Sequence, residues 1–205
     1  MRPRAAVRYR TMQASFIKSA ASSDGFPADA GAEVAVVGRS NSGKSSAINR
    51  IVGHGKLARV SKTPGRTQLI NFFDLGSERR LVDLPGYGFA RVPDRVRQQW
   101  GTLIEAYFRG RQSLRGLILT CDIRRGLTDS DRTMLEWSAA LELPALVLLT
   151  KADKLSRGAA ANRRLKVSRE LGESAEAILF SSVDGTGANQ ARSQLDSWLA
   201  DPPEP

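Results

Sequence analysis

The chain has 205 residues, of which 41% are hydrophobic and 25% charged, so its length suits one globular domain with short extensions. No apolar run approaches the roughly 20 residues that a membrane helix needs, which excludes a membrane-spanning protein. The net charge of +10 favours a polyanionic partner, most often nucleic acid, although basic surfaces also serve solubility or membrane contact.

The N-terminal segment, residues 1–22, contains several arginines and no acidic residue. It lacks the apolar core of a secretory signal, so we predict a basic N-terminal arm. A transit-like peptide and a true start at Met12 are alternatives. One domain is expected over residues 23–200, followed by a disordered tail over residues 201–205.

Strand and helix patterns alternate after this arm. Strands are predicted at 33–38, 68–75, 79–84, 116–122, 144–150 and 177–182. Helices are predicted at 44–53, 94–110, 128–141 and 162–172, with a last helix that carries Ala191, Leu195, Trp198 and Leu199. The second and third strands lie close enough in sequence to form an antiparallel hairpin. This alternation predicts a mostly parallel α/β sheet whose ligands bind beyond the carboxyl ends of the strands.

The only cysteine, Cys121, falls within an apolar strand pattern and is interpreted as an inert core thiol. A single cysteine excludes an internal disulfide and fits a reducing compartment. We therefore expect a cytoplasmic protein.

A glycine-rich segment, GRSNSGKS at 38–45, connects the first of these strands to the first helix. Its main-chain N–H groups can wrap phosphates, and the start of the helix adds partial positive charge. Lys44 is expected to reach the β- and γ-phosphates, and the Ser45 hydroxyl to bind Mg²⁺. The predicted phosphate-binding residues are Gly38, Arg39, Ser40, Asn41, Ser42, Gly43, Lys44, Ser45 and Ser46.

The tetrapeptide DLPG follows the third strand and gives four further candidates: Asp83, Leu84, Pro85 and Gly86. Asp83 could hold Mg²⁺ through water, and the N–H of Gly86 could meet a γ-phosphate. Such tetrapeptides are common turns, but this one ends a strand downstream of a phosphate loop.

Two strand ends near the C-terminus predict selection of guanine. In TKAD, the carboxylate of Asp153 can accept two hydrogen bonds from the base, and the stem of Lys151 can lie over the ring. In FSS, a main-chain N–H could meet the guanine carbonyl. The candidates are Thr150, Lys151, Ala152, Asp153, Phe180, Ser181 and Ser182.

The order GRSNSGKS, PGRTQ, DLPGYGFA, TKAD and FSS resembles that of the translation-factor-like small GTPases. The runs KTPGRTQLINFF and DLPGYGFARVP resemble the EngB/YihA/YsxC family of bacterial ribosome-assembly GTPases, and the likeness runs from about Phe16 to Leu199. It implies a three-layer α/β P-loop NTPase fold with six strands, one of them antiparallel.

The resemblance also implies site residues between the phosphate loop and the second strand. Thr67 would bind Mg²⁺ through its hydroxyl and the γ-phosphate through its N–H, with Thr63 as the alternative. The segment expected to contact nucleotide comprises Gly65, Arg66, Thr67, Gln68 and Leu69. Lys44, Thr67 and Gly86 would carry the catalytic contacts.

Three positions bear on turnover and cation use. Thr150 stands where the commonest form of this motif, Asn-Lys-x-Asp, has an asparagine. Its link to the phosphate loop would therefore have fewer hydrogen bonds than an amide would make. Tyr87 stands where many GTPases place a water-orienting glutamine, so intrinsic hydrolysis should be slow and triggered by a partner. Asn41 matches an asparagine that binds K⁺ in some related GTPases, and a loop-stabilising role is the equal alternative.

The predicted function is a GTP- and GDP-binding switch with Mg²⁺ that acts in large-subunit assembly by binding the ribosomal large-subunit precursor and rRNA. We expect a monomer without membrane contact. The alternatives are an RNA-binding protein whose nucleotide site is chiefly structural, and a kinase, against which TKAD and the lack of a lid argue.

Overall fold

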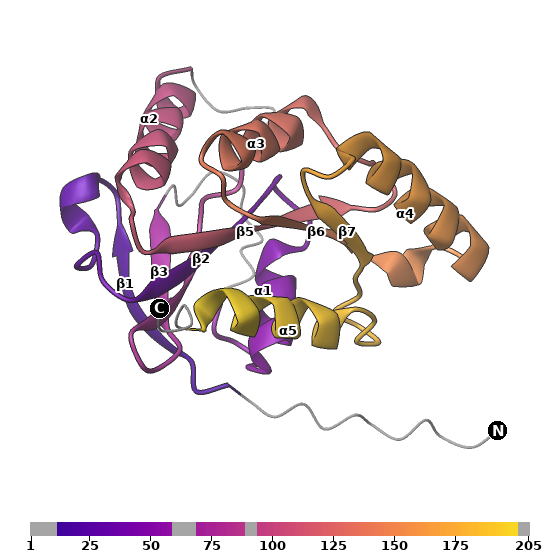
Figure 1. The fold of residues 1–205 in the computed structure, drawn as a ribbon, viewed down its shortest axis with the longest axis horizontal. Coiled ribbons are helices and arrows are strands. Elements are labelled where there is room, and N and C mark those ends of the chain that lie inside the picture. Colours follow the sequence, from indigo (N-terminus) through magenta and orange to yellow (C-terminus); the bar gives the residue numbers. More distant parts are fainter. Residues whose placement is uncertain (1–11, 59–68, 89–93, 201–205) are drawn as a thin grey trace.

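The computed structural model describes residues 12–58, 69–88 and 94–200, and of residues 94–100 the backbone alone. Among these residues, no helix combines the length and apolar character needed to cross a membrane. Residues 1–11, 59–68, 89–93 and 201–205 lie outside the described part (Figure 1).

A seven-stranded sheet forms the centre of the molecule, with strand order β1-β3-β4-β2-β5-β6-β7. The strands are β1 Ser15–Ala20, β2 Ala32–Gly38, β3 Ile70–Asp74, β4 Arg79–Asp83, β5 Leu114–Asp122, β6 Ala145–Thr150 and β7 Glu176–Leu179. Strand β3 runs antiparallel to both of its neighbours, β1 and β4, while the pairs from β4 to β7 are parallel. The predicted mostly parallel α/β architecture is confirmed.

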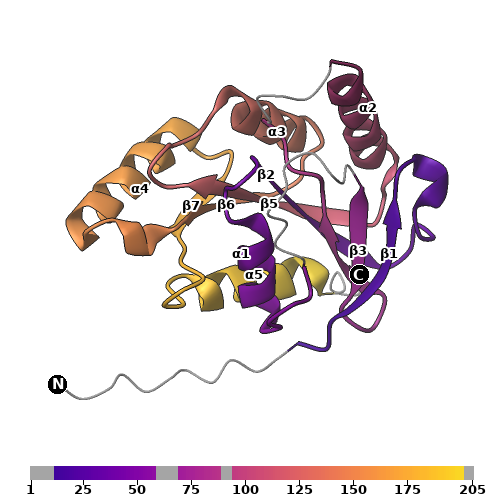
Figure 2. The same cartoon turned by 180° about the vertical axis from the view of Figure 1, so that it is seen from behind.

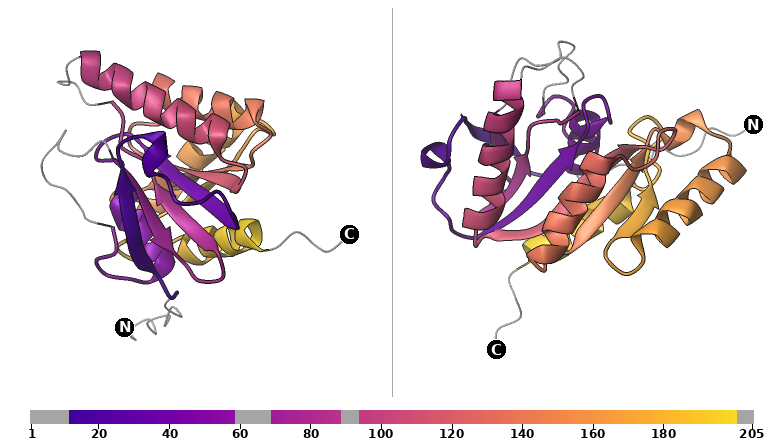
Figure 3. Two further views of the ribbon diagram at one scale, coloured as in Figure 1. Left: turned by 90° about the vertical axis from the view of Figure 1, so that its left-hand side faces the viewer. Right: turned by 90° about the horizontal axis from the view of Figure 1, so that it is seen from above.

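In the part of the chain that the structure describes, five α-helices cover the two faces of this sheet. They are α1 Lys44–Val52, α2 Asp94–Gly110, α3 Asp129–Ala140, α4 Arg157–Leu171 and α5 Ala188–Leu199. Helices α2, α3 and α4 lie on one face, and α1 and α5 lie on the other (Figures 1 and 2). The side view on the left of Figure 3 shows the same three layers.

The predicted number of six strands is wrong, because β1 forms a seventh at one edge of the sheet. Only the last residue of β1 is buried, so the strand lacks the apolar run or alternation that identifies the others. It is held by antiparallel pairing with β3 and by contact of Phe16 with Phe73. The sheet therefore extends into the segment that we assigned to the N-terminal arm.

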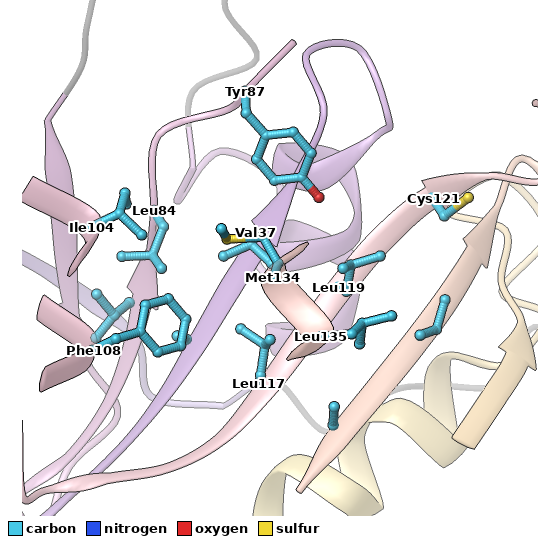
Figure 4. Packing of buried hydrophobic residues seen from close by; sticks show 14 of the residues in the cluster. Val37, Leu84, Tyr87, Ile104, Phe108, Leu117, Leu119, Cys121, Met134 and Leu135 are labelled. Atoms are coloured by element: carbon cyan, nitrogen blue, oxygen red, sulfur yellow. The ribbon is translucent and has the colours of Figure 1, made fainter. Parts of the chain in front are cut away.

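The core consists of two apolar layers, one on each side of the sheet. One layer packs α2, α3 and α4 against the strands through residues such as Ile104, Met134 and Val167. Figure 4 shows part of it, with Leu84 near Ile104 of α2 and Leu119 near Leu135 of α3. The other layer packs α1 and α5 against the strands through residues such as Ile48 and Leu195. Burial on both faces explains why the central strands are continuously apolar.

A buried carboxylate lies at the start of β2, the end farther from the phosphate loop. The side chain of Glu33 is fully buried and forms ion pairs with Arg80 and Arg111. The Tyr107 hydroxyl donates a further hydrogen bond to Glu33 at 3.0 Å. Since each charge has a partner, this cluster joins β2, β4 and α2 without leaving an unpaired ion in the core.

Candidate nucleotide-binding site

The phosphate loop connects the carboxyl end of β2 to the N-terminus of α1, as predicted. Helices α3 and α4 begin at capping side chains, Thr128 and Ser156, whereas α1 and α5 begin at left-handed glycines, Gly43 and Gly187, with no side-chain cap. Among the described residues, the main-chain N–H groups of 43–46 have no main-chain acceptor. A helix start with several free N–H groups is a binding site for an anion such as phosphate.

Two glycines set the shape of this loop. Gly43 has a φ of 95°, which side chains rarely adopt, and it turns the chain into α1. At Gly38 there is no room for a side chain, because an added Cβ would lie 2.1 Å from the Thr120 hydroxyl. That hydroxyl donates to the Val37 carbonyl at 3.1 Å, and it accepts from Ser42 at 2.7 Å. Thr120 on β5 thus fixes both sides of the loop.

Lys44 and Asp83 form an ion pair between the phosphate loop and the end of β4. Both side chains are mostly buried, and the other oxygen of Asp83 accepts from the Asn71 amide at 3.3 Å. The two candidates for phosphate and Mg²⁺ contact are therefore brought together. Each charge is the partner of the other, so neither is left unpaired at this mostly buried position.

Gly86 lies beside the phosphate loop. An added Cβ on Gly86 would lie 3.4 Å from the Gly38 oxygen and 3.5 Å from the Ser40 nitrogen. The next residue, Tyr87, accepts a hydrogen bond from Ser40 N–H at 2.8 Å. Leu84, two residues before Gly86, donates to the Val36 carbonyl at 3.0 Å. The strand end and its tetrapeptide are thus fixed against the loop on both sides of Gly86.

The TKAD segment contacts the phosphate loop directly. The Thr150 hydroxyl lies within hydrogen-bonding distance of the carbonyl of Ser42, as the predicted link required, and 3.0 Å from that of Cys121. The Lys151 ammonium donates to the Asn41 carbonyl at 2.7 Å. These bonds join the two loops at which phosphate and base would bind.

Asp153 and Ser181 meet at the end of β6. The Ser181 hydroxyl donates to the Asp153 carboxylate at 2.8 Å, and this bond is the main reason why the pKa of Asp153 is lowered. Ala152 N–H also donates to the Phe180 carbonyl at 3.1 Å. Asp153 therefore stays ionised, as an acceptor for two base donors must. Ser182 follows Ser181 and is half-buried.

The remaining predicted contacts follow the phosphate loop in sequence. Thr67, its alternative Thr63, and Gly65, Arg66 and Gln68 lie outside the described residues. Leu69 is half-buried and directly precedes β3. The assignment of Mg²⁺ and γ-phosphate contacts to Thr67 stays a prediction.

The sequence analysis missed Asp122, which ends β5 at the same edge of the sheet. Its carboxylate accepts from the Lys151 ammonium at 2.9 Å and from the Arg124 guanidinium at 2.7 Å. The hydrogen bond from Arg124, followed by the bond from Lys151, holds the pKa of Asp122 well below its usual range. Its position at a strand end, which pointed to Asp83 and Asp153, was the available signal.

Comparison with known proteins agrees with this arrangement. The model of the family described as 50S ribosome-binding GTPase matches residues 33–151, more than half of the chain. The chain is 53% identical over 190 residues to the probable GTP-binding protein EngB of Azoarcus sp. (strain BH72), a match that covers 91% of each chain.

Solved structures share the fold. A crystal structure of a probable GTP-binding protein EngB matches with a TM-score of 0.66 and 22% identity, covering 82% of this chain and 98% of that one. Era in complex with MgGDPNP and nucleotides 1506–1542 of 16S ribosomal RNA matches with a TM-score of 0.65 and 19% identity, covering 85% and 58%. The chain therefore belongs to the 50S ribosome-binding GTPases and, within them, to the EngB family of GTP-binding proteins.

Proposed function

We propose that this GTPase is a cytoplasmic switch with slow intrinsic hydrolysis that acts in assembly of the large ribosomal subunit. The observation that carries the nucleotide part is the uncapped start of α1, whose free N–H groups adjoin Lys44. The carboxylate of Asp153, set by Ser181, gives the same site its selection of guanine over adenine.

The oxygen donors at the phosphate end suit Mg²⁺. Ser45 offers a hydroxyl at the start of α1, and Asp83 offers a carboxylate that could act through water. No group of three or more His, Cys, Asp or Glu that could hold a metal occurs among the described residues. Mg²⁺ typically takes one or two protein ligands and completes its shell with phosphate oxygens and water. When bound, it would supply positive charge to the β- and γ-phosphates.

Slow hydrolysis follows from the side chain after Gly86. Tyr87 is only 4% exposed and its hydroxyl donates to Asp131, so it points into the core instead of orienting a water molecule at the phosphates. In this chain Lys44 would bind the phosphates, and the N–H of Gly86 would contact the γ-phosphate. A monovalent cation bound near Asn41, or a group from the partner, would supply the missing charge.

The proposed role in ribosome assembly rests on the excess of positive charge on α4. Helix α4 carries five cations and one acid, Glu170, which pairs with Arg132 of α3. Outside α4, the lysines and arginines of the described residues are balanced by an equal number of acids. Within the described part, none of the α4 cations forms an ion pair, and four of the five are exposed: Arg157, Arg164, Lys166 and Arg169. Unpaired arginines suit phosphate groups of RNA.

Co-sedimentation with purified ribosomal subunits and precursors tests this proposal. We expect binding to large-subunit particles that is stronger with a non-hydrolysable GTP analogue than with GDP, and GTP hydrolysis that rises when the particles are added. The double change Arg164→Glu/Arg169→Glu should weaken binding and flatten its dependence on salt concentration. The matched change Arg109→Glu/Arg115→Glu, outside α4, should have less effect.

The second candidate is an RNA-binding protein whose nucleotide site is chiefly structural, which the same basic helix would also fit. It predicts equal binding to particles with GTP and with GDP, and no stimulation of hydrolysis. Either result would count against the switch and in favour of this alternative.

A further inference from the structure

Tyr87 links the tetrapeptide that ends at Gly86 to the first turn of α3. Its side chain is buried, and its hydroxyl donates a short hydrogen bond to the Asp131 carboxylate, which is only 2% exposed. Figure 4 shows the ring of Tyr87 over Val37 and Met134, in the layer that also holds Leu84. The residue that replaces the usual glutamine is therefore fixed in the core.

The carboxylate of Asp131 accepts hydrogen bonds from two separate segments of the chain. One oxygen accepts from Tyr87, and the other accepts from the N–H and the hydroxyl of Thr128, each at 2.7 Å. The bond from the Thr128 N–H, together with the one that the Thr128 hydroxyl accepts from the Asp131 N–H at 3.4 Å, forms the capping box that begins α3. Because three donors surround it, this buried carboxylate stays bound in one orientation, and that orientation determines where the Tyr87 hydroxyl can lie.

The main chain of Tyr87 is fixed at the phosphate loop as well. Its carbonyl accepts from Ser40 N–H at 2.8 Å, and its N–H lies 3.4 Å from the Gly38 carbonyl. The chain then turns at Gly88, whose φ is 74° and whose added Cβ would lie 2.8 Å from the Arg39 side chain. Gly86 has no side chain of its own, so its position beside the loop depends on what holds its neighbour.

We propose that Tyr87, held by Asp131, is a positioning residue that keeps the Gly86 N–H aimed at the γ-phosphate of bound GTP. The assignment rests on the proposed nucleotide site. Only a triphosphate presents a γ-phosphate, so the Tyr87–Asp131 bond should stabilise binding of GTP and leave binding of GDP unchanged. A merely structural bond would affect both nucleotides equally or neither.

The test measures dissociation constants for GDP and for a non-hydrolysable GTP analogue by fluorescence titration with Mg²⁺ present. In Tyr87→Phe, we expect binding of the analogue to weaken by about fivefold to tenfold, which is less than the loss of a whole charged hydrogen bond, and that of GDP to change by less than about twofold. Asp131→Ala should give the same loss of selectivity, and the double variant should lose no more than either single variant.

Ser156→Ala is the matched control. It removes the capping hydroxyl of α4 and leaves Asp131 with all three of its donors, so it should lower the melting temperature without changing the ratio of the two affinities. If the ratio of affinities is unchanged in Tyr87→Phe, or if both nucleotides bind more weakly to the same extent, the role assigned to Tyr87 is wrong, but the proposed nucleotide site still stands. Failure of the unaltered protein to bind either nucleotide would overturn the proposed site together with that role.

Discussion

The ammonium group of Lys151 lies 2.7 Å from the main-chain oxygen of Asn41, so the segment proposed to recognise the base is bonded to the loop proposed to bind phosphate. Both residues have the left-handed conformation, with φ of 60° for Lys151 and 64° for Asn41. Asp122 accepts from the same ammonium, and the hydroxyl of Thr150 reaches the next carbonyl of the loop, that of Ser42. A substitution at one end of the site should therefore alter ligand binding at the other end.

Lys44→Ala tests the phosphate end. Loss of the charged contact should weaken binding of GTP and GDP by at least about 2 kcal/mol, or thirtyfold, in fluorescence titrations. Lys44 pairs with Asp83 at the edge of the sheet and belongs to neither apolar layer, so some stability should be lost but the fold and its circular dichroism spectrum should be retained. Lys56→Ala removes an exposed lysine shortly after α1 and serves as the control. Normal GTP binding by Lys44→Ala would show that this loop does not hold phosphate.

Asp153→Asn tests the base end. Xanthine has a carbonyl where guanine has an amine, so an amide at this position should shift preference from GTP toward XTP. Competition between the two nucleotides measures the shift. Asp129→Asn, which neutralises a fully exposed carboxylate in the first turn of α3, should leave selectivity as it is. Retained guanine preference in Asp153→Asn would remove this residue from the base contact.

Asn41 tests the use of K⁺. If a monovalent cation supplies positive charge between the phosphates, GTP hydrolysis should be faster in KCl than in NaCl at equal ionic strength. Asn41→Gly is the sharper variant, because glycine accepts the left-handed φ of 64° and only the amide is lost. It should erase the difference between the salts. Equal rates in both salts, with and without ribosomal particles, would leave Asn41 as a loop-stabilising residue.

Glu33→Ala tests the buried ion cluster far from the site. It would leave Arg111 buried without its main partner, so the free energy of unfolding should fall by about 3–5 kcal/mol in urea titrations. Glu105→Ala, which breaks an exposed pair with Arg109 on α2, should cost no more than about 0.5 kcal/mol. Nucleotide affinity of the folded protein should not change. A loss in Glu33→Ala no larger than in the control would mean that the cluster adds nothing to stability.

Alkaline pH tests the buried thiol. Burial raises the pKa of Cys121 to about 12 from an ordinary value of 9.0, so its stabilising effect is complete below pH 9 and is lost as pH rises toward 12. The free energy of unfolding should then fall by about 1 kcal/mol between pH 9 and pH 10. Cys121→Ala should remove this slope. Tyr87 and Tyr107, whose pKa values are also raised by burial, add to the loss only above pH 10.

The sequence by itself determined the alternating α/β order, the chemistry of the strand ends and the family, because apolar periodicity and short motifs are local. It also placed Lys44, Asp83 and Asp153 at the edge where strands of a parallel sheet present their ligands. It failed at β1, since an exposed edge strand needs only main-chain pairing and leaves little pattern in its side chains.

Only the tertiary structure decided which distant residues meet. The pairing of Lys44 with Asp83, the support of Lys151 by Asp122 and the bond from Tyr87 to Asp131 each join segments well separated in the chain. Nothing in a local pattern specifies such partners, because a hydroxyl or carboxylate at a strand end is compatible with many. The packing of α3 and of neighbouring strands on the sheet brings these particular pairs together. Each pair is then retained, because burying a polar group without a partner has a high cost in free energy.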